Sequence, residues 1–263
     1  MAKVDNEIKG RLALITGASG GIGAACARAL WDDGASLALT CFKNREPVDA
    51  LAKELLASSS SSSSSDEGRK ISVHVVDTGS VSDIEQLFRD MGRDHGGRGP
   101  DILVSNAGYG KRIPDVLDIP IDEFEYTLNI NLRASFVLAK LSIPHMREQG
   151  WGRIVFVSSI AAIGGGINGC HYAASKAGLT GMMKNLAAKQ AQYGITVNDV
   201  APAMIGDTGM IPDAKFVEGT AGDVKNIPVG RLGTPGECAN VVTMLCKTGY
   251  MTGQSILLSG GLR

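Results

Sequence analysis

The chain alternates short apolar runs, rich in Val, Ile and Leu, with longer amphipathic stretches, and this alternation limits the fold more than any other feature. Seven runs predict β-strands, at residues 12–16, 36–40, 71–76, 102–105, 153–157, 196–200 and 255–258. The stretches between them predict helices at 21–32, 47–57, 81–94, 121–149, 171–192 and 235–247. Strands that alternate with helices build a parallel sheet covered on both faces. The sequence therefore predicts an α/β fold, a single doubly wound Rossmann domain over residues 1–263 with a seven-stranded parallel sheet.

The charge balance and the apolar pattern narrow the class of partner. Lys and Arg number 26 and Asp and Glu 27, which gives a formal net charge of -1. A chain so balanced carries no long-range field that would attract nucleic acid or an anionic membrane. The N-terminal residues are polar, and no apolar run approaches the roughly 20 residues of a membrane helix. We therefore expect neither a nucleic-acid partner nor a membrane partner.

The cysteines and histidines favour an intracellular protein without a metal site. The five cysteines are scattered and form no C-x-x-C pair, which is typical of reduced thiols rather than of a disulfide framework. The four histidines are far apart in the sequence and do not resemble a zinc site. We expect a cytoplasmic protein with no metal ligands.

Two segments depart from the alternation. Residues 58–68 begin with a run of eight serines, which has no apolar group to bury and predicts a flexible surface loop; a phosphorylated or recognition segment is the alternative. Residues 203–230 are rich in Gly, Pro and Asp. So long a stretch without strong periodicity is typical of a lid, here over a substrate.

A glycine cluster stands where the first predicted strand leads into the first helix. Residues 16–23 read Thr-Gly-Ala-Ser-Gly-Gly-Ile-Gly. Glycine lets a backbone approach a ligand closely, and the free N–H groups of a helix start can face an anion such as a pyrophosphate. A tight turn would use the same residues, but the strand–helix junction favours a nucleotide. The predicted phosphate contacts are Gly17, Ser19, Gly21, Ile22 and Gly23.

The ends of the next three predicted strands would complete a nucleotide site. The second strand is followed by no acidic residue that could accept hydrogen bonds from the ribose hydroxyls. Nearby cations favour a 2′-phosphate and hence NADPH/NADP+, although solvated loop charges are the alternative and NADH/NAD+ stays open. Asp77 could accept from the adenine amino group or cap the following helix. The other predicted contacts at these strand ends are Cys41, Lys43, Asn44, Arg45, Asn106, Ala107 and Gly108.

Tyr172 and Lys176 are four residues apart, so both project from one face of a predicted helix. A nearby ammonium stabilises a phenolate and lowers the pKa of a tyrosine, ordinarily about 10. Such a pair can protonate a forming alkoxide or deprotonate an alcohol. Ser159 follows the strand predicted at 153–157, at the edge where sheets of this type bind ligands. The Tyr-x-x-x-Lys spacing alone is common on surface helices, and its company with Ser159, Asn131 and the glycine loop makes it specific.

In this combination and order the residues resemble the short-chain dehydrogenase/reductase family, in particular its 3-oxoacyl-(acyl-carrier-protein)-reductase-like branch. The resemblance runs from Gly10 to Leu262. It implies that Tyr172 is the general acid and that Ser159 orients the carbonyl. It further implies that Lys176 lowers the tyrosine pKa and holds the nicotinamide ribose, and that Asn131 bends its helix and holds a water.

The resemblance also implies further contacts and an assembly. Members of the family are usually homotetramers, a homodimer being the alternative, with the helices around Asn131 and Tyr172 at an interface. Gly20 stands where NADP-dependent members often carry a cation, and Gly150 and Tyr193 replace two arginines that often dock a carrier protein. Residues that would lie beside the nicotinamide are Tyr172, Lys176, Pro202, Ile205 and Thr208.

The residues expected around the substrate are mostly small or apolar, which predicts a neutral, fairly hydrophobic ketone as a small-molecule carbonyl substrate. They are Tyr109, Ile160, Ala162, residues 164–167, Met204, Ile205 and Phe216. The function predicted is NAD(P)-dependent hydride transfer to a 3-oxoacyl or other carbonyl compound, giving a secondary alcohol. The alternatives are an NAD-dependent secondary-alcohol or polyol dehydrogenase and a non-catalytic dinucleotide-binding sensor or scaffold.

Overall fold

The seven strands lie side by side in one parallel sheet. The computed structural model describes residues 4–59 and 68–262, and the strand order is β3-β2-β1-β4-β5-β6-β7. The strands are β1 (Leu12–Ile15), β2 (Ser36–Cys41), β3 (Ile71–Val75), β4 (Ile102–Ser105), β5 (Gly152–Val157), β6 (Ile195–Pro202) and β7 (Ser255–Leu258). This confirms the predicted doubly wound α/β fold. Residues 60–67 of the predicted serine-rich loop lie outside the described residues.

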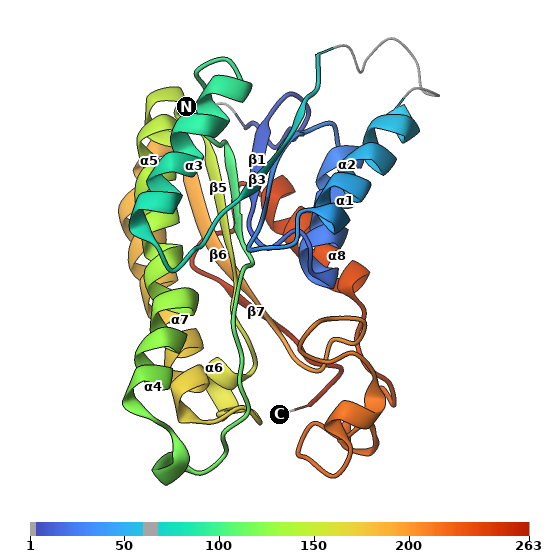
Figure 1. The fold of residues 1–263 in the computed structure, drawn as a ribbon. Helices are drawn as coiled ribbons and strands as arrows, with labels where there is room; N and C mark the ends of the chain where they lie inside the picture. The colour runs from blue at the N-terminus through green and yellow to red at the C-terminus, as the bar shows by residue number, and fades with distance from the viewer. Residues whose placement is uncertain (1–3, 60–67, 263) are drawn as a thin grey trace.

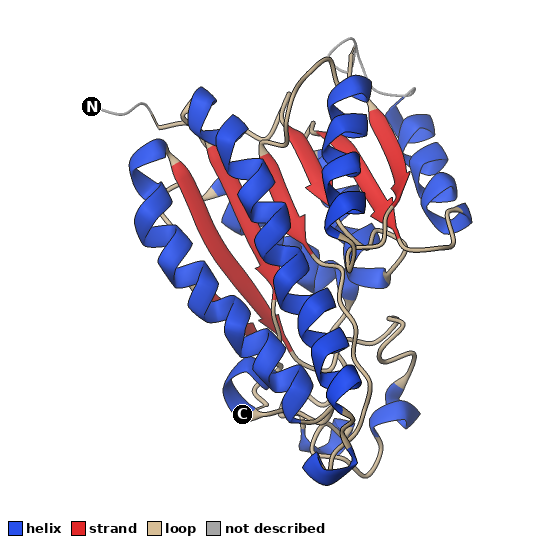
Figure 2. Ribbon diagram, turned by 60° about the vertical axis from the view of Figure 1, so that its left-hand side comes forward, coloured by secondary structure: helices blue, strands red, loops and turns tan. Residues whose placement is uncertain are grey.

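Helices cover both faces of the sheet (Figures 1 and 2). They are α1 (Gly21–Asp32), α2 (Glu46–Ser59), α3 (Val81–Asp94), α4 (Ile121–Leu128), α5 (Ala134–Gln149), α6 (Ala161–Gly164), α7 (Cys170–Gln190) and α8 (Pro235–Lys247). One face packs α1, α2 and α8 around Leu30, Trp31 and Val242. The other packs α3, α5 and α7 around Leu87 and Leu179. Two apolar cores therefore hold the sheet from either side, because each helix buries its apolar stripe against it.

The helix predicted at 121–149 is interrupted. Between α4 and α5, residues Asn129–Arg133 wind as a π-helix, which adds a residue to one turn. Asn131 lies in this turn and is 1% exposed. An apolar period averaged over the segment cannot show a single wide turn, so the sequence predicted one continuous helix. The resemblance had implied a bend at Asn131, and the irregular winding falls at that residue.

The topological switch point of the sheet lies between β1 and β4. The chain adds β2 and β3 to one side of β1, then returns to add β4 to β7 on the other side. In such sheets, ligands bind in the crevice outside the carboxyl ends of the strands at the reversal. The fold therefore places the end of β1, with its glycine cluster, beside the end of β4. Among the described residues, no helix has the length and apolar content that crossing a membrane requires.

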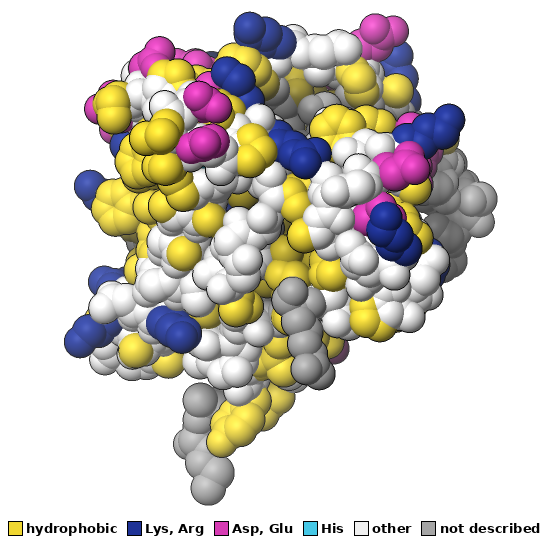
Figure 3. Space-filling model, turned by 90° about the horizontal axis from the view of Figure 1, so that it is seen from below, with side chains coloured by type: hydrophobic (Ala, Val, Ile, Leu, Met, Phe, Trp, Pro, Cys, Tyr) yellow, Lys and Arg dark blue, Asp and Glu magenta, His cyan; other side chains and the backbone are white. Residues whose placement is uncertain are grey.

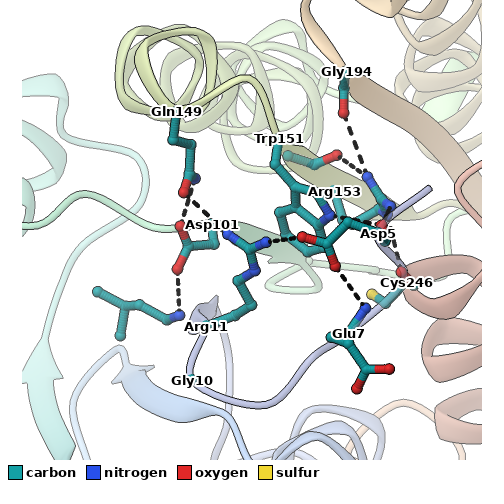
Figure 4. Close-up of polar contacts among 12 residues, drawn as sticks. Asp5, Glu7, Gly10, Arg11, Asp101, Gln149, Trp151, Arg153, Gly194 and Cys246 are labelled. Carbon is teal, nitrogen blue, oxygen red and sulfur yellow. Dashed lines mark hydrogen bonds and ion pairs between the residues drawn. The ribbon is translucent and has the colours of Figure 1, made fainter. Parts of the chain in front are cut away.

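At the amino ends of the strands, the segment before β1 is bound to residues at the start of β5 (Figure 4). The guanidinium carbons of Arg11 and Arg153 lie 4.0 and 4.2 Å from the ring centroid of Trp151. The indole N–H of Trp151 and Nη2 of Arg153 both donate to the backbone oxygen of Asp5, at 3.0 and 3.1 Å. Arg153 is 2% exposed. Its remaining nitrogens donate to the backbone oxygens of Cys246, Gly152 and Gly194.

Candidate active site

A cavity of about 570 Å³ opens at the carboxyl ends of the strands. Figure 3 looks onto this end of the molecule, where hydrophobic side chains spread between scattered charged ones. The predicted site residues that line the cavity are Gly17, Ser19, Gly21, Ile22, Cys41, Asp77, Asn106, Ala107, Gly108, Ser159, Tyr172, Lys176, Pro202, Ile205 and Thr208. The predicted residues outside its lining are Gly23, Lys43, Asn44, Arg45 and Asn131. Sequence elements far apart in the chain thus meet at one cavity.

The glycine loop is shaped for a backbone contact with an anion. Gly17 has a φ of 69°, which glycine adopts without strain. A Cβ on Gly23 would lie 2.3 Å from the Gly17 oxygen, and one on Gly21 would lie 2.4 Å from the Asp207 oxygen. Helix α1 has no side-chain cap at its N-terminus. No side chain therefore occupies its first N–H groups, and the glycines let the helix start pack closely against neighbouring backbone. A helix start of this kind can bind an anion such as a pyrophosphate.

Asn106 fastens this loop to the end of β4. Its Nδ2 donates to the backbone oxygens of Thr16 and Gly17 at 2.9 and 3.2 Å. The Thr16 hydroxyl in turn accepts from the backbone N–H groups of Asn106 and Ala107, both at 3.0 Å. The sequence pointed to this segment for its small size. Its role in holding the loop, and the part of Thr16, depend on a juxtaposition of strands that no local pattern shows.

The part of the cavity where the sequence predicts the adenine is lined by the ends of β2 and β3. Asp77 lies in the lining, and its Oδ1 accepts from the N–H of Gly79 at 2.8 Å. Helix α3 is capped by Ser80, whose hydroxyl accepts from the N–H of Asp83. Asp77 is therefore not the helix cap that the sequence left as its alternative role.

Residues 43–45, which follow Phe42 after the end of β2, lie outside the lining. Arg45 forms an ion pair with Asp49 at 3.0 Å, and Asn44 accepts from the N–H of Glu46. Lys43 lies 4.8 Å from the ring centroid of Phe42, which does line the cavity. Of the two cations, Lys43 is thus the one whose side chain packs against a lining residue.

Tyr172 lies in the first turn of α7 and is 7% exposed. Its hydroxyl is 4.0 Å from the sulfur of Met210. Burial raises the pKa of Tyr172 to about 12, and a hydrogen bond with Ser159 opposes the rise. Ser159 is held two residues past β5, where its hydroxyl accepts from the N–H of Ala161 at 3.1 Å. The phenol is therefore protonated at neutral pH and pointed at a second hydroxyl, which is the state a proton donor needs.

Lys176 lies one turn further along α7 and is 4% exposed. Its Nζ donates to the backbone oxygen of Val157 at 2.9 Å and lies 5.7 Å from the ring centroid of Tyr172. Burial lowers the pKa of Lys176 to about 8, and the carboxylate of Asp199 opposes the fall. In this arrangement Ser159 is the group that lowers the tyrosine pKa, an effect that the sequence had assigned to Lys176.

Asn131 stands behind the cavity wall. Its Oδ1 accepts from the N–H of Tyr109 at 2.8 Å, and its Nδ2 donates to the Tyr109 oxygen and to the Ser175 hydroxyl, both at 2.9 Å. The amide thus joins the π-helical turn to the loop after β4 and to α7. This fixes the wall against which Lys176 lies.

The cavity holds a cation that sequence reasoning missed. Arg112, an exposed residue in the loop after β4, is part of the lining. With Asp77 and Lys176 it makes up the charged lining of the described cavity, and it was not among the mostly small or apolar residues expected around the substrate. The neighbouring backbone runs beside the loop before α7, since the N–H of Ile113 donates to the oxygen of Asn168 at 2.9 Å. Together with the 3.1 Å contact between His171 Nε2 and the Lys111 oxygen, this contact brings Arg112 to the site, and no spacing predicts either contact.

The chain is similar over nearly its whole length to known proteins. Residues 17–263 match a family model described as enoyl-(acyl carrier protein) reductase. The chain is 35% identical over 260 residues to the 3-oxoacyl-(acyl-carrier-protein) reductase of Rickettsia bellii, covering 97% of this chain and 98% of that protein. It is 34% identical over 257 residues to nodulation protein G of Azospirillum brasilense, covering 96% and 98%. A solved short-chain dehydrogenase/reductase from Serratia marcescens matches with a TM-score of 0.85 and 31% identity, covering 97% and 99%.

Proposed function

The chain belongs to the short-chain dehydrogenase/reductase family of oxidoreductases, and we propose that it reduces a ketone to a secondary alcohol with a nicotinamide dinucleotide. The substrate is a 3-oxoacyl compound or another fairly hydrophobic carbonyl compound. The observation that carries the proposal is the buried, protonated Tyr172 hydroxyl beside Ser159 in the cavity wall. Consumption of reduced cofactor with a panel of activated ketones tests it. Binding of the cofactor without turnover would favour a sensor or scaffold instead.

In the proposed reaction Ser159 donates a hydrogen bond to the carbonyl oxygen, and Tyr172 transfers its proton to that oxygen as negative charge develops there. The reduced nicotinamide supplies the hydride when it is bound. The Tyr172 hydroxyl is well placed to lose a proton only in this step, since its raised pKa keeps it protonated at rest. Lys176 balances the phenolate charge that remains and, while charged, holds the nicotinamide ribose. Asn131 keeps the wall behind Lys176 in place.

The cavity suits a dinucleotide along its length. The uncapped start of α1 and the glycine loop would hold the pyrophosphate, Asp77 the adenine, and the segment from Pro202 to Thr208 the nicotinamide end. We propose NADPH rather than NADH. The support is the absence of an acidic residue at Cys41 and Phe42, where β2 ends against the cavity, and the position of Lys43 beside Phe42.

Replacing both Lys43 and Arg45 by Ala is expected to weaken NADPH binding about tenfold or more and to leave NADH binding within about twofold. The reason is that a charge-assisted contact to a 2′-phosphate is worth roughly 1.5–3 kcal/mol and NADH lacks that phosphate. Fluorescence titration of both cofactors measures the ratio. The single variant Arg45→Ala is the matched control, and its effect should be smaller because Asp49 already pairs with Arg45. Unchanged NADPH affinity in the double variant would favour an NAD-dependent dehydrogenase.

Arg112→Gln tests how neutral the substrate is. For an uncharged ketone we expect kcat/KM within about twofold of the parent, because the exposed guanidinium gives no net attraction to a neutral chain. For the same ketone with a carboxylate or phosphate on its far end, we expect a loss of about tenfold, the value of one charge-assisted hydrogen bond. The pair of substrates is the control. Equal losses of kcat/KM for both substrates would show that Arg112 maintains the loop conformation rather than binds a charged group on the substrate.

We propose that residues 203–230 form a lid over the substrate within one domain that spans residues 1–263. Residues of this segment that line the cavity include Met204, Met210 and Phe216. Met204 and Asp207 have φ values of 53° and 54°, a left-handed backbone that side-chain-bearing residues adopt at a cost. The strain lies at the start of the segment, where a hinge would be needed.

We propose a homotetramer, with a homodimer as the second candidate. Two separate surfaces expose large apolar side chains, as interfaces do. Phe136 on α5 is 51% exposed and Tyr126 on α4 44%, while Tyr250 and Leu257 beside and within β7 are 103% and 45% exposed. Sedimentation equilibrium measures the oligomeric state.

A cytoplasmic location is also proposed, since all five cysteines are free thiols, as is usual in a reducing compartment.

A further inference from the structure

Asp199 is a buried carboxylate behind the candidate active site. It has no role in the reaction proposed above. It lies in β6 and is 0% exposed. Its Oδ1 accepts from the hydroxyls of Ser158 and Ser255 at 2.7 and 2.6 Å, and its Oδ2 accepts from the hydroxyl of Thr180 at 3.2 Å. Within the described part of the chain, no cation lies within ion-pair distance of it. Burying a carboxylate raises the free energy of the folded state unless other groups stabilise it, so stabilising groups are needed here.

The three hydroxyls stabilise this buried carboxylate, because each donates a hydrogen bond to one of its oxygens. They also place it. Ser158 stands between Val157, whose backbone oxygen accepts from Lys176, and Ser159. Thr180 lies one turn after Lys176 on the same face of α7. The carboxylate therefore ties together the two pieces of chain that carry Ser159 and Lys176.

Lys176 is a buried ammonium that feels this carboxylate. Burial drives the pKa of Lys176 down, and the charge of Asp199 acts against that shift. Its other described neighbours bring no second carboxylate: α7 presents Tyr172, β5 the oxygen of Val157, and the π-helical turn the amide of Asn131. A charge on β6 is thus the compensation available to the ammonium.

We propose that Asp199 is a positioning residue that holds Lys176 in its charged form and fixes the end of β5 and the facing turn of α7. The role in catalysis rests on the proposed function, since it acts through Lys176. Removing the charge should make Lys176 lose its proton at lower pH. The sign follows from the pKa of about 8: the ammonium is present below that pH and is lost above it, and without Asp199 the loss begins earlier.

The first test reads the proton on Lys176 without any turnover. A trace of acetic anhydride labels only the neutral amine, and mass spectrometry of the peptide containing Lys176 gives the labelling rate against pH. In Asp199→Asn, which is close in shape and removes the charge, we expect the midpoint to fall by about one pH unit or more. Ser255→Ala is the matched control: it removes one hydroxyl from the same carboxylate, keeps the charge, and should leave the midpoint near that of the parent.

The second test is the pH profile of kcat for ketone reduction. The alkaline limb of Asp199→Asn should move to lower pH by the same amount as the labelling midpoint, while the rate recovers at acid pH. If Asp199→Asn does not fold, Asp199→Ser replaces it. An unchanged labelling midpoint in a folded, charge-free variant overturns the inference, even if stability falls. If the parent enzyme reduces no ketone, the proposed function fails, and the labelling midpoint still decides whether Asp199 holds the charge of Lys176.

Discussion

Tyr172→Phe is expected to lower kcat for ketone reduction by about 10²- to 10⁴-fold, the usual worth of a positioned proton donor. The substitution removes one oxygen and keeps the ring, so the packing of a side chain that is 7% exposed changes little. Cofactor affinity should fall by about tenfold at most, because a lost hydroxyl contact is worth roughly 0.5–1.5 kcal/mol. Steady-state turnover and fluorescence titration of NADPH on the same preparations measure both quantities.

Ser159→Ala is the companion variant. It leaves the proton donor in place but removes the hydroxyl that lowers the pKa of Tyr172, so it should reduce kcat less than Tyr172→Phe. His171, the next residue along, is not a substitute donor: its Nε2 lies 3.1 Å from the backbone oxygen of Lys111, and the residue is 0% exposed. Turnover by Tyr172→Phe within tenfold of the parent would mean that another group delivers the proton.

Arg153→Met is expected to lower the free energy of unfolding by about 3 kcal/mol. The methionine keeps much of the apolar stem, but the backbone oxygens of Asp5, Cys246 and Gly194 lose a charged donor in a buried place, each such bond being worth roughly 1.5–3 kcal/mol before relaxation. The N-terminal segment in Figure 4 should loosen with them. Urea denaturation followed by the fluorescence of the protein measures the change.

Arg11→Met separates this effect from the loss of a contact to Trp151. Arg11 also lies over that ring, at 4.0 Å, but its polar partners are the side chains of Asp5 and Gln149, and part of it faces solvent. An ion pair of this kind and a partly exposed cation–π contact are each worth about 1 kcal/mol or less. Equal losses in the two variants would show that the ring contact, and not the buried carbonyl set, holds the segment.

The strands and most helices were predictable because their signal is local. β1 is an example: Leu12–Ile15 is a continuous apolar run, and the structure places a strand there. The π-helical turn at Asn131 was not predictable, since Asn131 forms its hydrogen bonds with Tyr109 and Ser175, which are remote in sequence. The ends of α2 and α7 moved by one or two residues from their predicted positions, whereas α1, α3 and α8 have the predicted bounds.

The candidate site divides in the same way. The glycine loop and the pair on α7 follow from spacing within one turn or one junction, and the cavity brings Ser159 to them. The effect of Lys176 on Tyr172 could not be ranked from spacing, because it depends on burial and on where Nζ points. Arg112 and Asp199 were missed altogether. Both reach the site through neighbours far along the chain, and neither stands in a pattern of its own.

Transfer of deuterium from the cofactor tests the central claim most directly. The parent enzyme is incubated with a ketone and NADPH that carries deuterium at both C4 positions, and the alcohol product is analysed by mass spectrometry and NMR. We predict one deuterium on the carbinol carbon of every product molecule, and product formation far slower in Tyr172→Phe. A reduced product without deuterium on that carbon, or no alcohol from any ketone at saturating cofactor, would contradict the account.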